Sequence, residues 1–474
     1  MSDFSRKTLA ATRADGLGGR LLAMVNAKCL ADKLGCRFGF TWNRRSIDDM
    51  QFHIVDSVDK VFAPAFVERH WLGEKIDAVR FGVLGGTPFT RDSLAADADR
   101  NGFQGWICDD FRILRSFRQG WFKGLLPAYR PTRSRHRTFG TLGFSESVKA
   151  TIAAAHGFRF PRPMVALHLR SGDIIHGNYR SQMAFGDKVV PAPLARAIVS
   201  KLASKGLATL VIGQDRATLD YLKSETGAFL SDDFGAEQFE DETLKAFFEM
   251  ALMARCRQIH AGSSVFATIA SVMGGIRVLR PKAVFGARGT AAAILDELKA
   301  RQSDYHPLEA AYGYQSAIML MENSIGPAQA RGILEKAAAL DPQNPAYALK
   351  LAAGYFRERN FGDGEAILKA FMLGEIDAGT ENSMPILDVL TAPSWRGRMM
   401  AGDFELYFVA ANAGYPYAAA CSAQILHSAL GRTEAALSMV ALSLTAEPAN
   451  RLFREIELTV RTAATANDGS PLRS

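Results

Sequence analysis

The chain has 474 residues, which is long enough for two or three domains. Hydrophobic residues make up 48% of it and charged residues 22%, as in an ordinary globular protein, and 56 Lys and Arg against 49 Asp and Glu give a net charge of +7. Its five cysteines form no Cys-x-x-Cys pair, which argues against a disulfide framework or a zinc site and favours reduced thiols.

The sequence also lacks the marks of export and of membrane insertion. The first residues, Met1–Lys7, contain no apolar run of the kind that forms a signal peptide. The longest apolar stretch, Val265–Leu279, is interrupted by Gly274, Gly275 and Arg277 and falls short of the ~20 residues needed to cross a bilayer. We therefore expect a cytoplasmic protein, which could lie peripherally at the inner membrane.

The beginning of the chain has the pattern of a βα domain. Thr8–Thr12 is a strand candidate, and Asp15–Gly19 forms a glycine-rich turn before a predicted helix at Arg20–Leu34, whose apolar residues recur at helical spacing. Gly35 is expected to end this helix, and Cys36–Trp42 to form the next strand. The turn could bind phosphate at the helix N-terminus, or it could be a tight turn that packing requires.

A basic stretch follows this region. No acidic residue occurs from Phe111 to Ser145, and basic and aromatic side chains are interleaved through residues 112–137. Such a stretch suits an anionic membrane surface or an acidic acceptor. Nucleic acid would also suit it, but no nucleic-acid-binding motif accompanies it, so we expect none. A solvated loop is the remaining alternative.

Strand and helix candidates then alternate as in a second Rossmann-like half. The strand candidates are Val165–Leu169, Ala208–Gly213, Phe229–Ser231 and Gln258–Ala261. The helix candidates are Pro193–Ser204, Arg216–Thr226, Asp241–Cys256 and Val265–Met273. Ligands of open α/β sheets bind at the carboxyl ends of the strands, so the residues that follow each strand are the candidates for a site.

The clearest candidate motif for a ligand site lies at the end of the first of these strands. Met164–Leu169 leads into a turn that contains His168, Arg170, Gly172 and Asp173. Arg offers a planar fork of donors that matches phosphate oxygens, His adds a second donor, and Gly lets the backbone approach a ligand closely. The alternative is an ion pair from Arg170 to Asp173 that braces the turn.

Two further strand ends carry residues with two interpretations each. Asp215 is either the N-cap of the next helix or an acceptor for a guanine edge or a ribose hydroxyl. Ser263 and Ser264 are N-cap candidates, and their hydroxyls, together with the N–H groups at that helix start, could also hold a β-phosphate.

The segment from Asp173 to Lys188 is unusually polar. It is longer than the ~2–6 residues of an ordinary connection, and long loops in compact domains are often functional. His176, Asn178, Tyr179, Arg180 and Lys188 within it suit a sugar and a diphosphate.

Strand signals vanish from about residue 305. Ala330, Leu334, Ala337 and Pro342 have the spacing of the second half of a tetratricopeptide repeat. Stacked helix pairs of this kind form concave surfaces that bind protein partners. The alternative is a plain helical extension that packs on the rest of the chain.

We therefore expect an α/β protein with an appended all-α, repeat-like domain. The expected parts are a Rossmann-like domain at 1–155, a second one at 156–300, a helical domain at 305–460 and a disordered tail at 461–474.

Four segments, in order, resemble the motifs of the GDP-fucose-dependent fucosyltransferase superfamily. This superfamily includes the α1,2-, α1,6- and protein O-fucosyltransferases and the rhizobial nodulation fucosyltransferase. The matching segments are Asp15–Leu22, His168–Asp173, Leu210–Asp215 and Ile259–Thr268. The resemblance covers roughly residues 8–285, and Gly19 stands where many members have Asn.

The resemblance implies a GT-B fold, in which two Rossmann-like domains face a cleft, and a role for each matching residue. The residues implied in catalysis are Arg170, His168 and Asp173. Those implied in donor binding are Gly172, His176, Asp215, Ser263, Ser264 and Phe266. The acceptor side of the cleft would contain Gly16, Gly18, Gly19 and Arg20.

The implied activity is an inverting transfer of fucose from GDP-fucose to a bacterial glycan, such as a surface polysaccharide, lipopolysaccharide or lipo-oligosaccharide. Cationic side chains would stabilise the negative charge on the leaving diphosphate. We therefore expect no metal and no cofactor besides the nucleotide-sugar substrate. Asp173 or His176 could act as the base, or no side chain need do so. Two alternatives stay open: a related transferase with another nucleotide sugar, and a non-enzymatic repeat scaffold with vestigial Rossmann domains.

Overall fold

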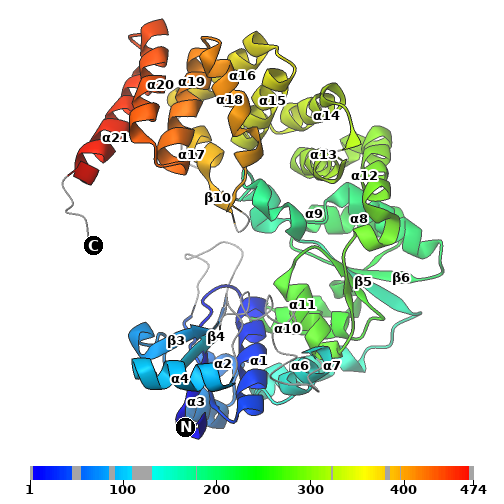
Figure 1. Cartoon of the computed structure of the whole chain (residues 1–474). Helices are drawn as coiled ribbons and strands as arrows, with labels where there is room; N and C mark the ends of the chain where they lie inside the picture. Colours follow the sequence, from blue (N-terminus) through cyan, green and yellow to red (C-terminus); the bar gives the residue numbers. More distant parts are fainter. Residues whose placement is uncertain are drawn as a thin grey trace. The chain divides into compact units, whose positions relative to one another are not determined.

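The computed structural model of the chain (Figure 1) divides into two compact units. The first consists of Met1–Arg170 and Ile198–Pro281, and the second of Ser171–Ala197 and Lys282–Ser474. The three predicted domains divide the chain differently, and their bounds stay predictions. The structure describes residues 4–44, 55–84, 91–108, 131–177, 179–321, 324–378, 385–394 and 397–468.

The first unit contains two parallel sheets. The first sheet has the strand order β2-β1-β4-β3. Its strands are β1 (Thr8–Ala11), β2 (Arg37–Phe40), β3 (Phe81–Leu84) and β4 (Gly105–Cys108). The predicted strands after Lys7 and Gly35 are confirmed. Helix α1 (Leu17–Leu34) ends where predicted but begins three residues earlier than Arg20, so part of the glycine-rich turn forms its first turn.

The second sheet has five parallel strands in the order β7-β6-β5-β8-β9. The strands are β5 (Met164–His168), β6 (Ala208–Ile212), β7 (Phe229–Leu230), β8 (Ile259–Ala261) and β9 (Val278–Leu279). The helices between them are α8 (Ala192–Ala203), α9 (Arg216–Thr226), α10 (Glu242–Ala254) and α11 (Val265–Gly274). The alternation predicted for this half is confirmed, and the apolar stretch Val265–Leu279 is a helix, α11, that leads into a strand, β9.

One hydrophobic core joins the two sheets. Helix α1 packs against α11 and against α6 (Pro131–Phe139), while α10 packs against α11 and α7 (Glu146–Gly157). Aromatic rings continue this contact, because Phe144 lies 5.7 Å from Phe62 and 5.3 Å from Phe247 of α10, measured between ring centroids. Two Rossmann-like sheets followed by a helical region confirm the predicted fold class.

The second unit is largely helical. From α12 to α16, and again from α18 to α21, each helix packs against the next one in the chain, while α17 and α18 both pack against α15 (Figure 1). Most of the unit therefore has the arrangement of stacked helix pairs. The helices are α12 (Lys282–Arg301), α13 (Pro307–Met321), α14 (Pro327–Leu340), α15 (Pro345–Arg357), α16 (Phe361–Ala378), α17 (Ile386–Thr391), α18 (Phe404–Asn412), α19 (Pro416–Gln424), α20 (Thr433–Ala446) and α21 (Arg451–Asp468). Their tetratricopeptide character stays a prediction.

Two expectations need correction here. Helix α21 continues to Asp468, so residues 461–468 are helical and do not belong to a disordered tail; the last six residues lie outside the described part. In the basic stretch, residues 109–130 also lie outside the described part. Arg135 of α6 is only 9% exposed and is therefore not available to an anionic surface. No helix that the structure describes could cross a bilayer.

Gly105 is the position at which the first sheet tolerates a side chain least. A Cβ atom there would lie 1.9 Å from the carbonyl oxygen of Thr8 in β1. We expect Gly105→Ala to lower the free energy of unfolding by about 1–3 kcal/mol or more, because the strands must separate. Urea unfolding followed by tryptophan fluorescence measures this, since Trp106 is buried in β4.

The matched control is Gly332→Ala in α14, where a Cβ atom would meet no atom within 4 Å. There alanine should leave stability unchanged or raise it by up to ~1 kcal/mol, because alanine favours helix. Equal stability of Gly105→Ala and the unmodified protein would contradict the predicted clash.

Candidate functional site

The candidate site lies where the strand order of the second sheet reverses. From β5 the chain proceeds to β6 and β7 on one side, and then returns to place β8 and β9 on the other side of β5. In open α/β sheets the crevice that binds ligands forms at this reversal, outside the carboxyl ends of the strands. The turn after β5 and the start of α11 after β8 therefore lie next to each other.

His168 and Phe266 make contact across this reversal. Their rings stack with centroids 5.4 Å apart and an interplanar angle of 30°. Burial, together with the smaller effect of the nearby charge of Arg170, lowers the pKa of His168 to about 3. The imidazole is therefore neutral at pH 7 and can donate from one nitrogen only. Its Nδ1 has no hydrogen-bond partner among the described residues.

The start of α11 presents donors beside this stack. Ser264 is the N-cap, as its Oγ accepts from the backbone N–H of Ala267 at 3.3 Å. The N–H groups of Val265 and Phe266 are left without an acceptor in the part of the chain that the structure describes. Because these groups form the positive end of the helix, they suit an anion. The half-buried Ser263 also has no hydrogen bond to a described residue.

Asp215 acts as an N-cap, which was one of its two predicted roles. Its carboxylate accepts from the N–H of Ala217 at 3.2 Å and from the Thr218 hydroxyl at 2.6 Å. These bonds hold the start of α9 at the end of β6. A contact from Asp215 to a nucleotide stays a prediction.

The glycine-rich loop packs directly on the start of α11. Gly16 is the N-cap of α1, and the next two glycines lie in its first turn. A Cβ atom at Gly18 would lie 3.1 Å from the Cα of Phe266 and 3.2 Å from its nitrogen. At Gly19 a Cβ atom would meet the carboxylate of Asp15 at 2.3 Å. A side chain at Gly19 would only displace the flexible Asp15 carboxylate, whereas one at Gly18 would press on the backbone of Phe266. Gly18 therefore keeps the α11 N-terminus uncrowded.

Arg20 supports this loop from within. Its side chain is 1% exposed and lies with its guanidinium carbon 5.1 Å from the centre of the Trp42 ring. Its nitrogens donate to the carbonyl oxygens of Asp15 and Asn43, each at 2.6 Å, and of Ala14 at 3.1 Å. These contacts show that Arg20 supports the loop, and its place on the acceptor side of a cleft stays a prediction.

The boundary between the two units falls within the predicted motif, directly after Arg170. Arg170 is half-buried and ends the first unit, while Gly172, Asp173 and His176 lie on a π-helical turn of the second. The alternative of an Arg170–Asp173 ion pair therefore stays a prediction. Within the second unit, a small cluster buries this turn against α13. It consists of Ile174, Ile175, Val189 and Tyr312.

Polar contacts fix the same turn to α13. The Nε2 of His176 lies 3.7 Å from a carboxylate oxygen of Glu309, which is 1% exposed, and its ring lies 5.0 Å from that of His306. The other oxygen of Glu309 accepts from the Ala192 N–H at 2.8 Å. Sequence reasoning missed Glu309 and His306, because a helix start 130 residues downstream gives no local sign of this contact.

Two further side chains predicted in this segment, Arg180 and Lys188, make contacts with other side chains. The Nε of Arg180 lies 3.5 Å from Asp341, and the ammonium of Lys188 lies 4.2 Å from the centre of the Phe185 ring. Asn178 lies outside the described residues. The whole segment is therefore anchored on the helical unit.

One Asp-x-Asp spacing, typical of manganese sites, occurs at Asp97 and Asp99. Both residues lie in α4 (Arg91–Asn101). Residues two apart on a helix face nearly opposite sides, so these two carboxylates do not converge on one ion.

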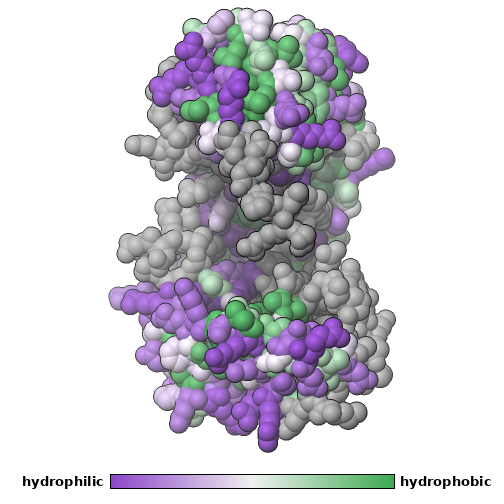
Figure 2. All heavy atoms as spheres, turned by 60° about the vertical axis from the view of Figure 1, so that its left-hand side comes forward, coloured by the Kyte–Doolittle hydropathy of each residue, from purple (hydrophilic) through white to green (hydrophobic). Residues whose placement is uncertain are grey.

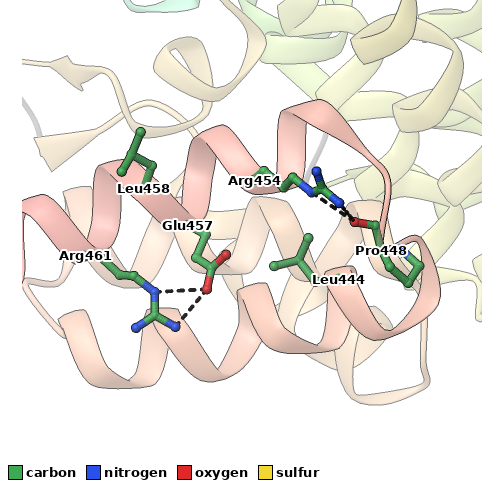
Figure 3. A pocket seen from close by; sticks show the side chains of 6 residues that line it. All are labelled: Leu444, Pro448, Arg454, Glu457, Leu458 and Arg461. Carbon is green, nitrogen blue, oxygen red and sulfur yellow. Dashed lines mark hydrogen bonds and ion pairs between the residues drawn. The ribbon is translucent and has the colours of Figure 1, made fainter.

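A hollow at the end of the helical stack is a weaker candidate. Hydrophobic side chains reach the surface on this face of the helical unit (Figure 2), and Leu458, which lines the hollow, is 67% exposed. The polar groups at this hollow already have partners: Arg461 binds Glu457, and Arg454 donates to the carbonyl oxygen of Pro448 (Figure 3). No group there points to a ligand.

No protein-family model and no curated protein matches the chain. Among solved structures, fucosyltransferase NodZ from Bradyrhizobium has 14% identity over 56% of this chain and 91% of that chain, with a TM-score of 0.33. A mutant of Arabidopsis thaliana FUT1 in complex with GDP has 13% identity over 59% and 71%, with a TM-score of 0.38. POFUT1 in complex with GDP-fucose has 12% identity over 59% and 98%, with a TM-score of 0.32. Likenesses this weak do not establish an activity.

The buried His168 should make the first unit sensitive to acid. The unfolded chain takes up a proton at this residue near pH 6.5, whereas the folded chain does so only near pH 3. Stability is therefore complete above pH 6.5 and is lost as the pH falls through this window, by up to about 1.4 kcal/mol per pH unit. His168→Gln, which cannot take up the proton, should show a smaller loss between pH 6.5 and 5.

The measurement is urea unfolding at several pH values, followed through the buried Trp42 and Trp106. All other histidines are common to both proteins, so the difference between the two curves reports on His168. Parallel curves for the variant and the unmodified protein would contradict the neutral, buried state of this imidazole.

Proposed function

We propose that the chain is an inverting, metal-independent glycosyltransferase that moves fucose from GDP-fucose to a bacterial glycan acceptor. One observation carries the proposal: the His168–Arg170 turn and the donor-rich start of α11 meet at the strand reversal, where His168 stacks on Phe266. This combination of a guanidinium and helix N–H groups suits a diphosphate. The order of the four fucosyltransferase-like motifs supports GDP-fucose over another nucleotide sugar.

In this reaction an acceptor hydroxyl attacks C1 of the sugar from the face opposite the nucleotide. The bond from C1 to the β-phosphate oxygen breaks, and its electron pair stays on the diphosphate. Arg170 and the N–H groups of Val265 and Phe266 would stabilise that growing charge. Neutral His168 would donate one hydrogen bond without adding charge.

The proton of the acceptor hydroxyl requires a base or water. We place this role on His176, because the buried Glu309 lies close to its Nε2 and can stabilise the imidazolium that forms. Asp173 is the alternative on the same turn. In either case the helical unit holds the base, since the turn is buried against α13.

The acceptor would be reached in the cytoplasm, at the inner membrane if it is lipid-linked. The basic stretch at 112–137 would attract an anionic membrane surface, and the helical unit would offer a surface to a protein partner. No nucleic acid enters this proposal.

A thermal-shift screen with GDP, UDP and CMP in the presence of EDTA tests the proposed donor. GDP at about 100 times its dissociation constant should add about 2.7 kcal/mol of stability and raise the melting temperature by several degrees. UDP and CMP should shift it less. No response to any nucleotide would favour the scaffold alternative, and a response that EDTA removes and manganese restores would contradict metal independence.

Arg170→Ala should reduce transfer by roughly 10²–10³-fold, about 3–4 kcal/mol, by analogy with the loss of a donor to an oxyanion. Arg170→Lys should also be impaired, because the planar fork of donors is lost. Release of GDP from GDP-fucose measures the effect. The control is Arg257→Ala, an exposed arginine that precedes β8 at the opposite edge of the same sheet. Near-normal turnover by folded Arg170→Ala would contradict the assignment.

A further inference from the structure

The helical unit contains a pocket of about 310 Å³ that the proposed function does not use. Its walls come from α13, α14 and α15, from the hairpin of β10 (Pro393–Ser394) and β11 (Gly397–Arg398), and from the Met183–Lys188 helical turn. Its volume is at the lower end of the range of small-molecule sites, about 300–1,000 Å³. A short ligand would therefore fit, and a folded partner would not.

One wall of the pocket carries a buried amide without a partner. Gln315 of α13 is 0% exposed, and neither its Oε1 nor its Nε2 has a hydrogen-bond partner among the described residues. The Tyr312 hydroxyl, one turn earlier, interacts with it but makes no hydrogen bond of normal geometry. Because buried amides are nearly always bonded, this one indicates a ligand group that is still to be supplied.

Cations outnumber carboxylates among the side chains that line the pocket: Arg331, Lys350, Arg357 and Arg398 against Asp187 and Asp403. The Nζ of Lys350 lies 2.6 Å from one oxygen of Asp403, and an Nη of Arg357 lies 3.0 Å from the other. A single buried carboxylate thus serves two cations. Arg398, which also lines the pocket, donates to two backbone carbonyl oxygens and, among the described residues, to no carboxylate. An anion would be favoured beside these cations.

The remaining lining includes an arginine that is already paired and apolar side chains. Arg331 lies 2.5 Å from Glu335 and 3.1 Å from Glu358, so its charge is already met. Three methionines, Met183, Met319 and Met399, supply flexible apolar walls. Since methionine has three rotatable bonds, these side chains can move aside and give a ligand access to Gln315.

We infer that this pocket binds an anionic amphiphile, a phosphate or carboxylate on a short apolar chain. The anionic head lies at Lys350, Arg357 and Arg398, and the chain lies against the methionines. Gln315 bonds a polar atom near the head. The inference does not depend on the proposed transfer reaction, because every wall belongs to the helical unit.

The test uses the full chain and hexyl phosphate as the probe, with hexylamine and inorganic phosphate as matched probes. Calorimetry should show binding of hexyl phosphate and at least tenfold weaker binding of the other two. Arg357→Gln should weaken hexyl phosphate binding by about tenfold, since it removes one partly exposed charge and leaves Lys350 on Asp403. Arg359→Gln, an exposed neighbour outside the pocket, is the control and should bind as the unmodified protein does.

Methyl NMR of the 15 methionines locates the bound probe. Signals of Met183, Met319 and Met399, assigned with Met→Leu variants, should shift on addition of hexyl phosphate. Shifts at these three support the site. Shifts confined to other methionines, equal binding of inorganic phosphate or hexylamine, or unchanged binding by folded Arg357→Gln would each overturn the inference.

Discussion

The reversal of strand order between β5 and β8 is the constraint on which the candidate site depends. Parallel strands require crossover connections. Here these connections place β6 on one side of β5 and β8, which comes later in the chain, on the other side. The two neighbours end at the same edge, so the His168 turn and the Ser264 cap meet although almost 100 residues separate them. No individual side chain needs to create this proximity, because backbone topology has already done so.

The contact between α1 and α11 at this edge of the second sheet is part of the core that the two sheets share. Helix α1 approaches the start of α11 closely at Gly18, where a Cβ atom would lie 3.1 Å from the Cα of Phe266. Arg20 then holds the loop by donating to its carbonyl oxygens from a buried position. The two interpretations of the glycine-rich turn are therefore compatible: it packs tightly, and by doing so it leaves the N–H groups of α11 uncrowded.

Local patterns made the strands, the helices and the caps at Asp215 and Ser264 predictable, because periodicity and N-cap chemistry act over a few residues. The fold class followed from their alternation. Contacts between distant segments were not predictable. Glu309 and Gln315 look like ordinary helix positions in sequence, and only packing buries them. The burial of Arg135 likewise depends on tertiary packing of α6, which a basic run does not reveal.

Asp173 and His176 belong to the helical unit, so its first helices support predicted site residues. Their turn buries Ile174 and Ile175 against Tyr312 of α13, and each such side chain contributes about 1.5–3 kcal/mol when fully buried. A chain that ended near Ser303 would expose both isoleucines and remove Glu309 from His176. Repeats that merely recruit a partner could be removed without such losses. The first helices therefore act as structural support for the proposed base, and a surface for partners must lie farther along the stack.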